Sequence, residues 1–447
     1  MGRRALALAT LALTAGIAAA ARADDPFLRR TATVNVVETV GPAVVNITTE
    51  RTSTRRRFGV FAPNRVFDQF FRDFFEPRLP QTSQSLGSGV VIDDLGHILT
   101  NQHVVAGASR IRVSTADGRE FEASLIGADP NNDIAVLKVQ SEEELPWITP
   151  GNSDDLLVGE PVIAIGNPFG LSSTVTTGVI SALNRSVRTD ARVFHGFLQT
   201  DASINPGNSG GPLLSAEGQL IAINTAVYQG GQGIGFAIPI DTAKRVIREL
   251  IAHGEVIPAW LGLDFQDLAP ALRQGLGLPA DLRGALVNRV RERGPAAQAG
   301  IRRGDVLTRV DGRPLYTARE FFEMLETVTV GQQLGLDVWR EGRVRTLSLR
   351  ASEIPADLVA QLVNDLLGLR LTRPPQGGNF VVQAVRAGSG ADRIGIQPGD
   401  LVLGINGRNL DTDEALRRSA LELRGHLRAL IVVQRGSGRY HVTIPLV

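Results

Sequence analysis

The residues of this sequence that could perform chemistry begin with one serine set among glycines. Ser209 lies in the run Asn-Pro-Gly-Asn-Ser-Gly-Gly-Pro-Leu-Leu, which covers residues 205–214. A serine hydroxyl is a weak nucleophile, so a reactive serine must be exposed and adjacent to a base. The glycines allow the backbone to fold back and to aim successive N–H groups at the point where an oxyanion would form. The alternative for this run taken alone is a glycine-rich turn between two strands, and the motif needs its sequence context to be decided.

A histidine and an aspartate upstream supply the other groups that such a serine needs. His103 ends an apolar strand in the run Leu-Thr-Asn-Gln-His-Val-Val, and Asp133 opens another in Asn-Asp-Ile-Ala-Val-Leu-Lys-Val. In this combination Ser209 attacks a carbonyl carbon, while His103 takes the serine proton and passes it to the leaving amine. Asp133 fixes the imidazole tautomer and stabilises its positive charge. The three residue types therefore predict acyl transfer with a serine nucleophile.

The three blocks resemble the active-site blocks of the HtrA/Deg (Do-type) serine proteases. They read TNQHVV, NNDIAVLKV and TDASINPGNSGGPLL, and their His-Asp-Ser order is that of chymotrypsin-like proteases. The resemblance covers nearly the whole chain after residue 34. It implies a mainly β fold, with a chymotrypsin-like double β-barrel protease domain followed by two PDZ (α+β) domains. It also implies that His103, Asp133 and Ser209 are the catalytic triad.

The same resemblance implies that the backbone of Gly207, Asn208 and Ser209 forms the oxyanion hole. Two positions depart from the common family pattern, since Gln102 stands where Asn is frequent and Pro206 where Arg is frequent. Neither departure removes a catalytic group, although a proline beside the loop lacks an N–H and stiffens the backbone.

The C-terminal part of the chain repeats itself at a spacing of 95 residues. The run Gly300–Leu307 matches Gly395–Val402, and Val310–Leu315 matches Ile405–Leu410. This pattern resembles PDZ domains, which bind C-terminal peptides as an added strand and cap their carboxylate with backbone N–H groups. The second copy could instead be only a packing module. The resemblance assigns carboxylate-binding loops to two triplets, Leu261, Gly262 and Leu263 in the first copy and Leu367, Gly368 and Leu369 in the second.

Short strands separated by regular turns must position the serine site. Residues 90–100 and the turn at 116–119 read as hairpins, and 34–50 as a helix or a strand. Two barrels meeting near residues 146–152 fit this spacing, and Asp241 is predicted to cap a helix that ends at Gly254. We predict four segments: a signal peptide at 1–23, a trypsin-like protease domain at 24–256, and PDZ domains at 257–352 and 353–447.

The N-terminus has the pattern of a secretory signal. Arg3 and Arg4 precede an apolar Ala/Leu run, and Ala-Arg-Ala at 21–23 offers a cleavage site, which predicts export to a periplasm. The alternative is an uncleaved membrane anchor; the mature chain is predicted to have no transmembrane segment. Residues 1–23 carry three arginines and no acidic residue, so cleavage would take the formal net charge from +1 to −2. This charge gives no basis for nucleic-acid binding.

Seven of the 17 phenylalanines lie between Phe58 and Phe75. Crowded apolar residues in a loop-like segment usually mark an interaction surface. Since HtrA relatives are built on trimers, we expect a homotrimer or a multiple of trimers; the alternative is a loop folded on its own barrel. Asp129, Asn131 and Asp133 mimic the start of a calcium loop, but glycine and glutamate are missing at its later positions, so no metal is predicted.

These features together predict a serine endopeptidase without a cofactor. The resemblance implies that it degrades unfolded or misfolded envelope proteins, that its PDZ domains bind peptides and regulate activity, and that it could add a chaperone activity. The rival interpretation is a binding protein, either a chaperone or a PDZ scaffold, with an inactive protease domain. The chain contains no cysteine, so it can form neither a disulfide nor a cysteine-ligated zinc site.

Overall fold

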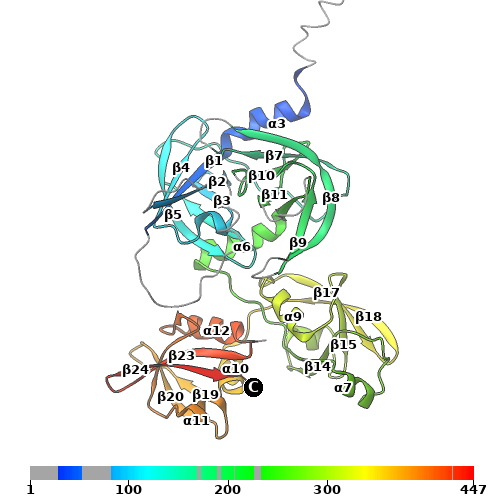
Figure 1. The fold of residues 1–447 in the computed structure, drawn as a ribbon, viewed down its shortest axis with the longest axis vertical. Coiled ribbons are helices and arrows are strands. Elements are labelled where there is room, and N and C mark those ends of the chain that lie inside the picture. The colour runs from blue at the N-terminus through cyan, green and yellow to red at the C-terminus, as the bar shows by residue number, and fades with distance from the viewer. Residues whose placement is uncertain are drawn as a thin grey trace, which may run out of the picture. The chain divides into compact units, whose positions relative to one another are not determined.

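The chain divides into two compact units, residues 1–255 and 256–447 (Figure 1). The computed structural model describes residues 29–52, 82–168, 173–188, 193–205, 207–225, 233–424 and 426–446. The predicted signal peptide, the phenylalanine-rich segment and Pro206 lie outside these residues. Within the described ranges, no helix is long and apolar enough to cross a membrane, and no cluster of His, Asp and Glu could hold a metal ion.

The first unit contains two closed barrels, each built from six antiparallel strands. The first barrel consists of β1 (Val44–Thr52), β2 (Thr82–Val91), β3 (His97–Thr100), β4 (Arg110–Ser114), β5 (Glu120–Asp129) and β6 (Ile134–Lys138). The second consists of β7 (Pro161–Gly166), β8 (Thr174–Arg188), β9 (Val193–Thr200), β10 (Pro212–Ser215), β11 (Leu220–Thr225) and β12 (Gly235–Pro239). Each barrel encloses its own cluster of buried aliphatic side chains. The predicted double barrel is therefore confirmed.

The two hairpins predicted in the first barrel are confirmed. Strands β2 and β3 pair through Val90 and Leu99, and β4 pairs with β5 across the Asp-Gly turn. The stretch 34–50, predicted as one element, is divided between α3 (Ala32–Val40) and β1. A short 3-10 turn at 41–43 separates them, because proline inside it cannot continue the helical hydrogen-bond pattern.

Helix α6 (Ile240–His253) contacts strands of both barrels, β5 and β6 in the first and β11 and β12 in the second. It ends at Gly254, whose φ of +75° is the left-handed conformation that glycine adopts readily. The predicted cap at its start is wrong, because Pro239 is the N-cap and Asp241 lies inside the first turn. The Asp241 carboxylate instead accepts bonds from the backbone N–H and hydroxyl of Ser153, which ties α6 to the segment between the barrels.

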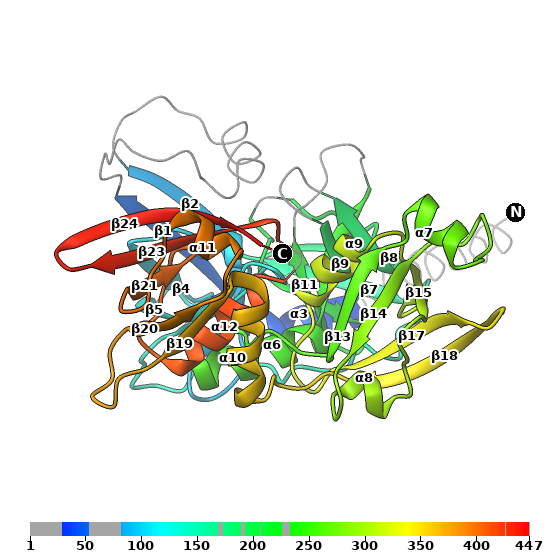
Figure 2. The same ribbon diagram turned by 90° about the horizontal axis from the view of Figure 1, so that it is seen from below.

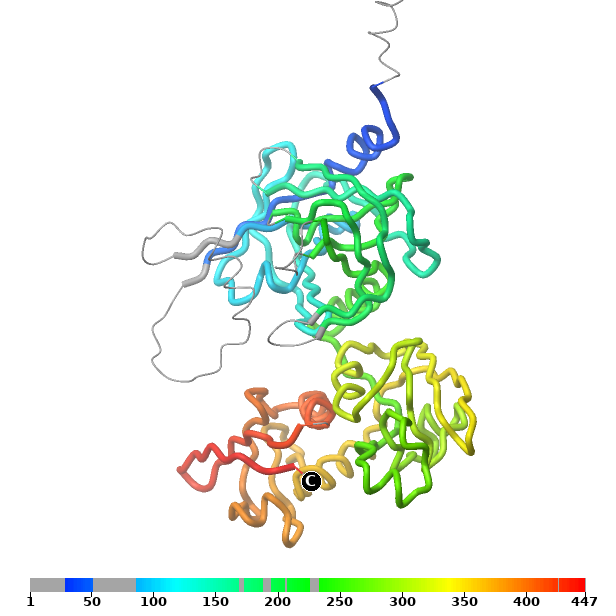
Figure 3. The backbone as a smooth tube through the Cα atoms, turned by 45° about the vertical axis from the view of Figure 1, so that its right-hand side comes forward, coloured from blue at the N-terminus to red at the C-terminus, as the bar shows by residue number. Residues whose placement is uncertain are grey.

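The second unit contains two sheets with the same strand order, one for each copy of the repeat. Figure 3 traces the backbone of the two copies, the first in green to yellow and the second in orange to red. The first copy comprises β13 (Leu263–Asp267), α7 (Pro270–Gly275), β14 (Ala285–Val290), α8 (Pro295–Gln298), β15 (Val306–Val310), β16 (Arg313–Pro314), α9 (Ala318–Leu325), β17 (Gln333–Arg340) and β18 (Arg343–Arg350). The second comprises α10 (Ala356–Leu367), β19 (Leu369–Thr372), β20 (Phe380–Val385), α11 (Gly390–Ile394), β21 (Leu401–Ile405), β22 (Arg408–Asn409), α12 (Asp413–Glu422), β23 (Arg428–Arg435) and β24 (Gly438–Pro445).

The hairpins β17–β18 and β23–β24 extend from the two sheets, in yellow and red in Figure 2. The turns that follow β15 and β21 are also equivalent. Asp311 and Asn406 both have φ of +47°, and each is followed by a glycine with positive φ. Their side-chain oxygens accept the backbone N–H of Gly335 and Leu430, respectively, so each turn is fastened to the next long strand. The repeated sequence motif therefore folds into a turn of the same geometry in both copies.

Candidate active site

The first barrel holds the histidine and the aspartate. His103 lies in α5 (Gln102–Val105), a single helical turn directly after β3, so it is not on the strand itself. Asp133 directly precedes β6 and has φ of +54°, a left-handed conformation that aspartate tolerates better than most residues. Strands β3 and β6 pair as far as Thr100 and Ala135. This register places the segment after β3 beside the residue that precedes β6.

Asp133 holds His103 by three contacts. Its Oδ1 accepts the backbone N–H of His103 at 3.0 Å, and its two carboxylate oxygens lie 2.9 and 2.8 Å from His103 Nδ1. Thr225, at the end of β11 in the second barrel, donates its hydroxyl to Asp133 Oδ2 at 3.0 Å. Both ring and carboxylate are buried, with 5% and 3% of their residues' surfaces exposed. The carboxylate thus fixes which ring nitrogen carries a proton: Nδ1 donates to it and Nε2 faces away.

The serine comes from the second barrel, in the turn 207–210 before β10. Glycine is required at position 210, since a Cβ there would collide with the carbonyl oxygen of Ser88 and the hydroxyl of Thr100. This close approach lets the backbone N–H of Ser88 donate to the Ser209 carbonyl at 2.9 Å. The glycines therefore bring the serine turn into contact with the first barrel.

Ser209 Oγ lies 3.0 Å from His103 Nε2, so the structure joins the three predicted residues in one hydrogen-bonded chain. They are separated by up to 106 positions in the sequence. A nucleophile within hydrogen-bond reach of a base, and a base oriented by a third group, is the arrangement that activates a serine. The geometry can support proton transfer from Ser209 to His103 during attack on a carbonyl carbon.

Asn208 forms hydrogen bonds with the residues that lead into the same turn. Its amide oxygen accepts the backbone N–H of Asn205 at 2.9 Å, and its Nδ2 donates to the Ser203 carbonyl at 3.0 Å. Its own backbone N–H donates to the Asn205 carbonyl at 3.2 Å. In this structure that N–H is used inside the turn. The assignment of the oxyanion hole to the backbone of Gly207, Asn208 and Ser209 stays a prediction.

Sequence reasoning missed three polar residues of the site: Asn101, Thr225 and Ser88. Asn101 Oδ1 accepts from Ser209 Oγ at 2.9 Å, and Ser88 Oγ donates to the Gly207 carbonyl. Thr225 and Ser88 carry no signal in the sequence, because each lies in an ordinary strand far from the residue that it contacts. Asn101 could have been noticed, since it lies two residues before His103.

The two predicted carboxylate loops both begin an edge strand. Gly262 precedes β13 with φ of +76°, and Gly368 precedes β19 with φ of +73°. Their carbonyls accept equivalent bonds from the backbone N–H groups of Arg291 and Arg386, both at 2.8 Å. Strands β13 and β19 stand at the ends of their sheets, and in the part of the chain that the structure describes no further strand pairs with their outer edges, so an extended peptide could add there.

Comparison with known proteins agrees with this architecture. Residues 87–223 match the trypsin-like peptidase domain family, and residues 259–350 and 381–435 each match the PDZ domain family. The chain is 38% identical over 408 residues to a probable periplasmic serine endoprotease DegP-like from Pseudomonas fulva, which covers 83% of this chain and 84% of that protein. It is 35% identical over 480 residues to the periplasmic serine endoprotease DegP of Escherichia coli strain K12, with 99% of each chain covered.

The chain belongs to the HtrA/Deg family of serine endoproteases. A solved structure of a variant of the HtrA-type protease AlgW with a decapeptide is also similar, with 40% identity and a TM-score of 0.50 over 72% of this chain and 98% of that chain. The predicted fold, a double-barrel protease domain with two PDZ domains, is confirmed, and so is the predicted enzyme class. The names of the Pseudomonas fulva and Escherichia coli relatives describe periplasmic or probable periplasmic proteases.

Proposed function

We propose that this HtrA/Deg protease degrades unfolded or misfolded proteins in the periplasm, using Ser209 as nucleophile, His103 as general base and acid, and Asp133 as the group that orients His103. One observation carries this proposal: the hydrogen-bonded chain from Asp133 through His103 Nε2 to Ser209 Oγ. The backbone N–H groups of Gly207, Asn208 and Ser209 would stabilise the oxyanion. They belong to the same turn as the nucleophile, so the donors and Oγ move as one unit.

The other parts of the proposal concern export, assembly and control. Residues 1–23 are removed as a signal peptide, and the mature chain assembles as a homotrimer or a multiple of trimers. The open edges of β13 and β19 support capture of C-terminal peptides by the PDZ domains, whose occupancy regulates cleavage. A chaperone activity accompanies proteolysis. Size measurement of the mature protein by analytical ultracentrifugation, with and without substrate, tests the assembly; only monomer in all conditions would refute it.

A fluorophosphonate label tests the catalytic assignment. It should modify Ser209 in the parent protein, and Ser209→Ala should remove both the label and the cleavage of an unfolded protein substrate. We expect a loss of cleavage of about 10⁶-fold, because the members of a triad act as a unit. Ser215→Ala is the matched control, since Ser215 ends β10 shortly after the serine turn and its hydroxyl oxygen accepts the backbone N–H groups of Glu217 and Gln219 in its own turn. Cleavage by the Ser209→Ala protein at the parent rate would reject the assignment and favour an inactive scaffold.

A further inference from the structure

The hydroxyl of Ser209 faces two hydrogen-bond acceptors and has only one proton to donate. His103 Nε2 lies 3.0 Å from Oγ, and Asn101 Oδ1 lies 2.9 Å from the same atom. General-base catalysis requires the proton to point at Nε2 when the attack begins. A proton donated to Asn101 therefore leaves the serine correctly placed but not poised to react.

The orientation of the Asn101 amide follows from its other bond. Its Nδ2 donates to the carbonyl oxygen of Asp133 at 3.0 Å, and an oxygen placed there could not bond to a carbonyl. Asn101 Oδ1 must therefore be the atom that faces Ser209, and an amide oxygen can only accept. Asn101 is fully buried, with 0% of its surface exposed, so its amide cannot turn to water. The backbone N–H of Gln102 also donates to the Asp133 carbonyl, which holds the whole segment in place.

We propose that Asn101 is a positioning residue that holds the resting proton of Ser209 away from His103. This inference rests on the proposed triad. In the resting state Oγ–H donates to Asn101 Oδ1. When a substrate carbonyl arrives, that bond breaks, the proton transfers from Oγ to His103 Nε2, and a bond forms between Oγ and the carbonyl carbon while the C=O π pair moves onto the carbonyl oxygen and makes it an oxyanion. An interaction present in the ground state and lost in the transition state slows the reaction, so Asn101 limits the intrinsic reactivity of the serine.

The experiment measures how fast full-length variants react with a fluorophosphonate. Asn101→Leu keeps the branched shape of the side chain, removes the acceptor and leaves no room for water. The Asp133 carbonyl keeps its bond from Gln102. We expect labelling to accelerate about three- to tenfold, which is the rate equivalent of one ordinary hydrogen bond. With a short peptide substrate, kcat should rise while KM stays unchanged.

Asn224→Leu is the matched control. Asn224 is also fully buried, and its Nδ2 donates to the Pro212 carbonyl at 2.9 Å, yet its side chain has no bond to Ser209. This variant should react no faster than the parent. Asn101→Asp keeps an oxygen acceptor in the same place and should also show no acceleration. Faster labelling of Asn101→Leu alone supports the proposal, because a merely structural defect slows an enzyme.

Equal or slower labelling of a folded Asn101→Leu protein overturns the proposal. If that variant does not fold, Asn101→Ala takes its place under the same criterion, with Asn224→Ala as its control. The parent protein separates this inference from the proposed function. If the parent is not labelled at Ser209, the triad assignment fails; if it is labelled and no Asn101 variant reacts faster, only the role of Asn101 fails.

Discussion

The two PDZ domains share an arginine–aspartate pair but differ in the equivalent helices α9 and α12. In the first domain Arg340 bonds to both carboxylate oxygens of Asp305, and in the second Arg435 bonds in the same way to Asp400. Each arginine also donates to a backbone carbonyl, at Gly300 and Gly395 respectively. These contacts recur at the 95-residue spacing, so they belong to the part of the domain that the repeat preserved.

The helices α9 and α12 are covered differently. In α9 the buried residues form one stripe, and Glu323 and Met324 are only half-buried. At the equivalent positions of α12, Arg418 and Ser419 are 2% and 1% exposed. Helix α10 contacts α12, and its buried side chains belong to the same core as those of α12. The second domain thus covers with its own helix a face that the first domain leaves accessible.

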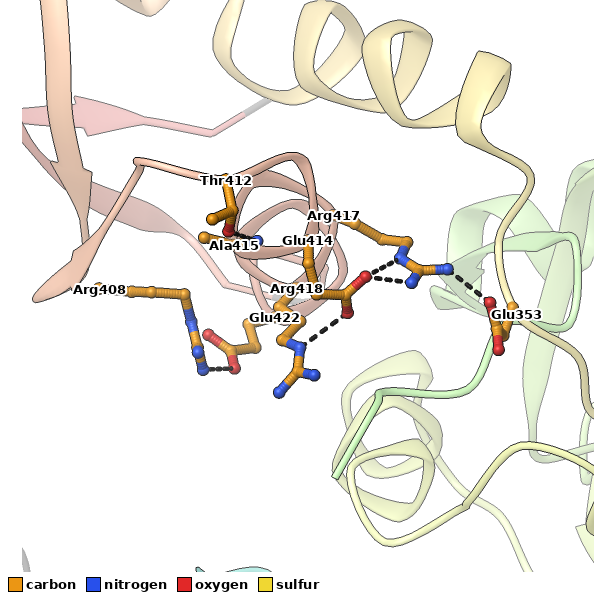
Figure 4. A network of polar contacts seen from close by, with 8 residues as sticks. All are labelled: Glu353, Arg408, Thr412, Glu414, Ala415, Arg417, Arg418 and Glu422. Carbon is orange, nitrogen blue, oxygen red and sulfur yellow. Dashed lines mark hydrogen bonds and ion pairs between the residues drawn. The ribbon is translucent and has the colours of Figure 1, made fainter. Parts of the chain in front are cut away.

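The side chains of the two helices differ accordingly. Phe265 of β13 and Phe321 and Phe322 of α9 form an aromatic cluster with ring centroids 4.4 to 6.3 Å apart. In α12 the residue equivalent to Phe322 is Arg417, which bridges Glu414 and Glu353 (Figure 4). The two domains therefore keep the same arginine–aspartate pair while the side chains of α9 and α12 differ. We expect both domains to bind peptides, and the first to bind them more tightly than the second.

Breaking the arginine–aspartate pair should have the largest effect on domain stability. The loss should be larger in the first domain. Asp305 and the Arg340 side chain are 1% and 11% exposed, whereas 45% of the Arg435 side chain is exposed. Asp305→Ala should destabilise its domain by about 1.5–3 kcal/mol, because it removes the charged hydrogen bonds of a partly buried guanidinium that keeps its bond to the Gly300 carbonyl. Asp400→Ala should cost less, since Arg435 can be solvated by water.

Hydrogen–deuterium exchange of the full-length chain at β15 and β21 measures this difference. The control is Glu341→Ala, which removes the partner of Arg345 in an exposed pair and should change stability by no more than about 0.5 kcal/mol. Equal loss of protection in Asp305→Ala and Asp400→Ala would show that burial of the arginine does not set the strength of this pair.

Exchanging the residue types at the equivalent positions 322 and 417 should sharpen the contrast in peptide binding. Phe322→Arg places a charge in the aromatic cluster and should weaken binding of a peptide with an apolar C-terminus by about tenfold or more. Arg417→Phe should change binding little, because α10 covers α12 in the second domain. Fluorescence anisotropy with a labelled peptide measures both. Stronger binding in Arg417→Phe than in the parent would show that α10 does not limit peptide binding by the second domain.

Acid should weaken the pair formed by Asp400 and Arg435 and so lower the stability of the second PDZ domain. The hydrogen bond from Arg435 lowers the pKa of Asp400 below its ordinary value of 3.8. A lowered pKa in the folded state adds stability that is fully present above the unfolded pKa of about 3.9 and is lost as the pH falls through the folded pKa. Arg435→Gln should therefore reduce the stability of the second domain at neutral pH and flatten its decline below about pH 4. Hydrogen–deuterium exchange at β21 and β23 across pH 2–7 measures how stability declines in acid. If Arg435→Gln leaves this pH profile unchanged, the pair of Arg435 and Asp400 does not stabilise the domain.

The smallest effect is expected where the two PDZ domains meet. Arg291 donates to Asp264, beside the first carboxylate loop, at 3.4 Å and to Asp365 of α10 at 3.1 Å. Asp365 is one-third exposed, so the interaction should be worth less than about 1 kcal/mol and should be screened by salt. Asp365→Asn should change peptide affinity of the first domain by about twofold or less at low salt and not at all at high salt. A tenfold change would mean that the second domain sets the shape of the first loop.

The sequence by itself determined the residue types that do chemistry and the repeat. Ser209 among glycines, His103 and Asp133 next to apolar strands, and the matched turns at Asp311 and Asn406 are all local patterns. Local patterns can be read because backbone geometry and side-chain chemistry restrict which residues serve in a tight turn or at a nucleophile.

Only the tertiary structure decided which further groups complete these patterns. The contacts of Ser209 with Asn101 and of Thr225 with Asp133 join residues 108 and 92 positions apart, across two barrels. The sequence placed the cap of α6 at Asp241, whereas packing turned that carboxylate toward Ser153. It also could not show that α10 covers α12. Such contacts depend on how separately folded segments pack, and an asparagine, a threonine or an apolar helix face has the same local pattern whether it meets a catalytic serine, a second helix or water.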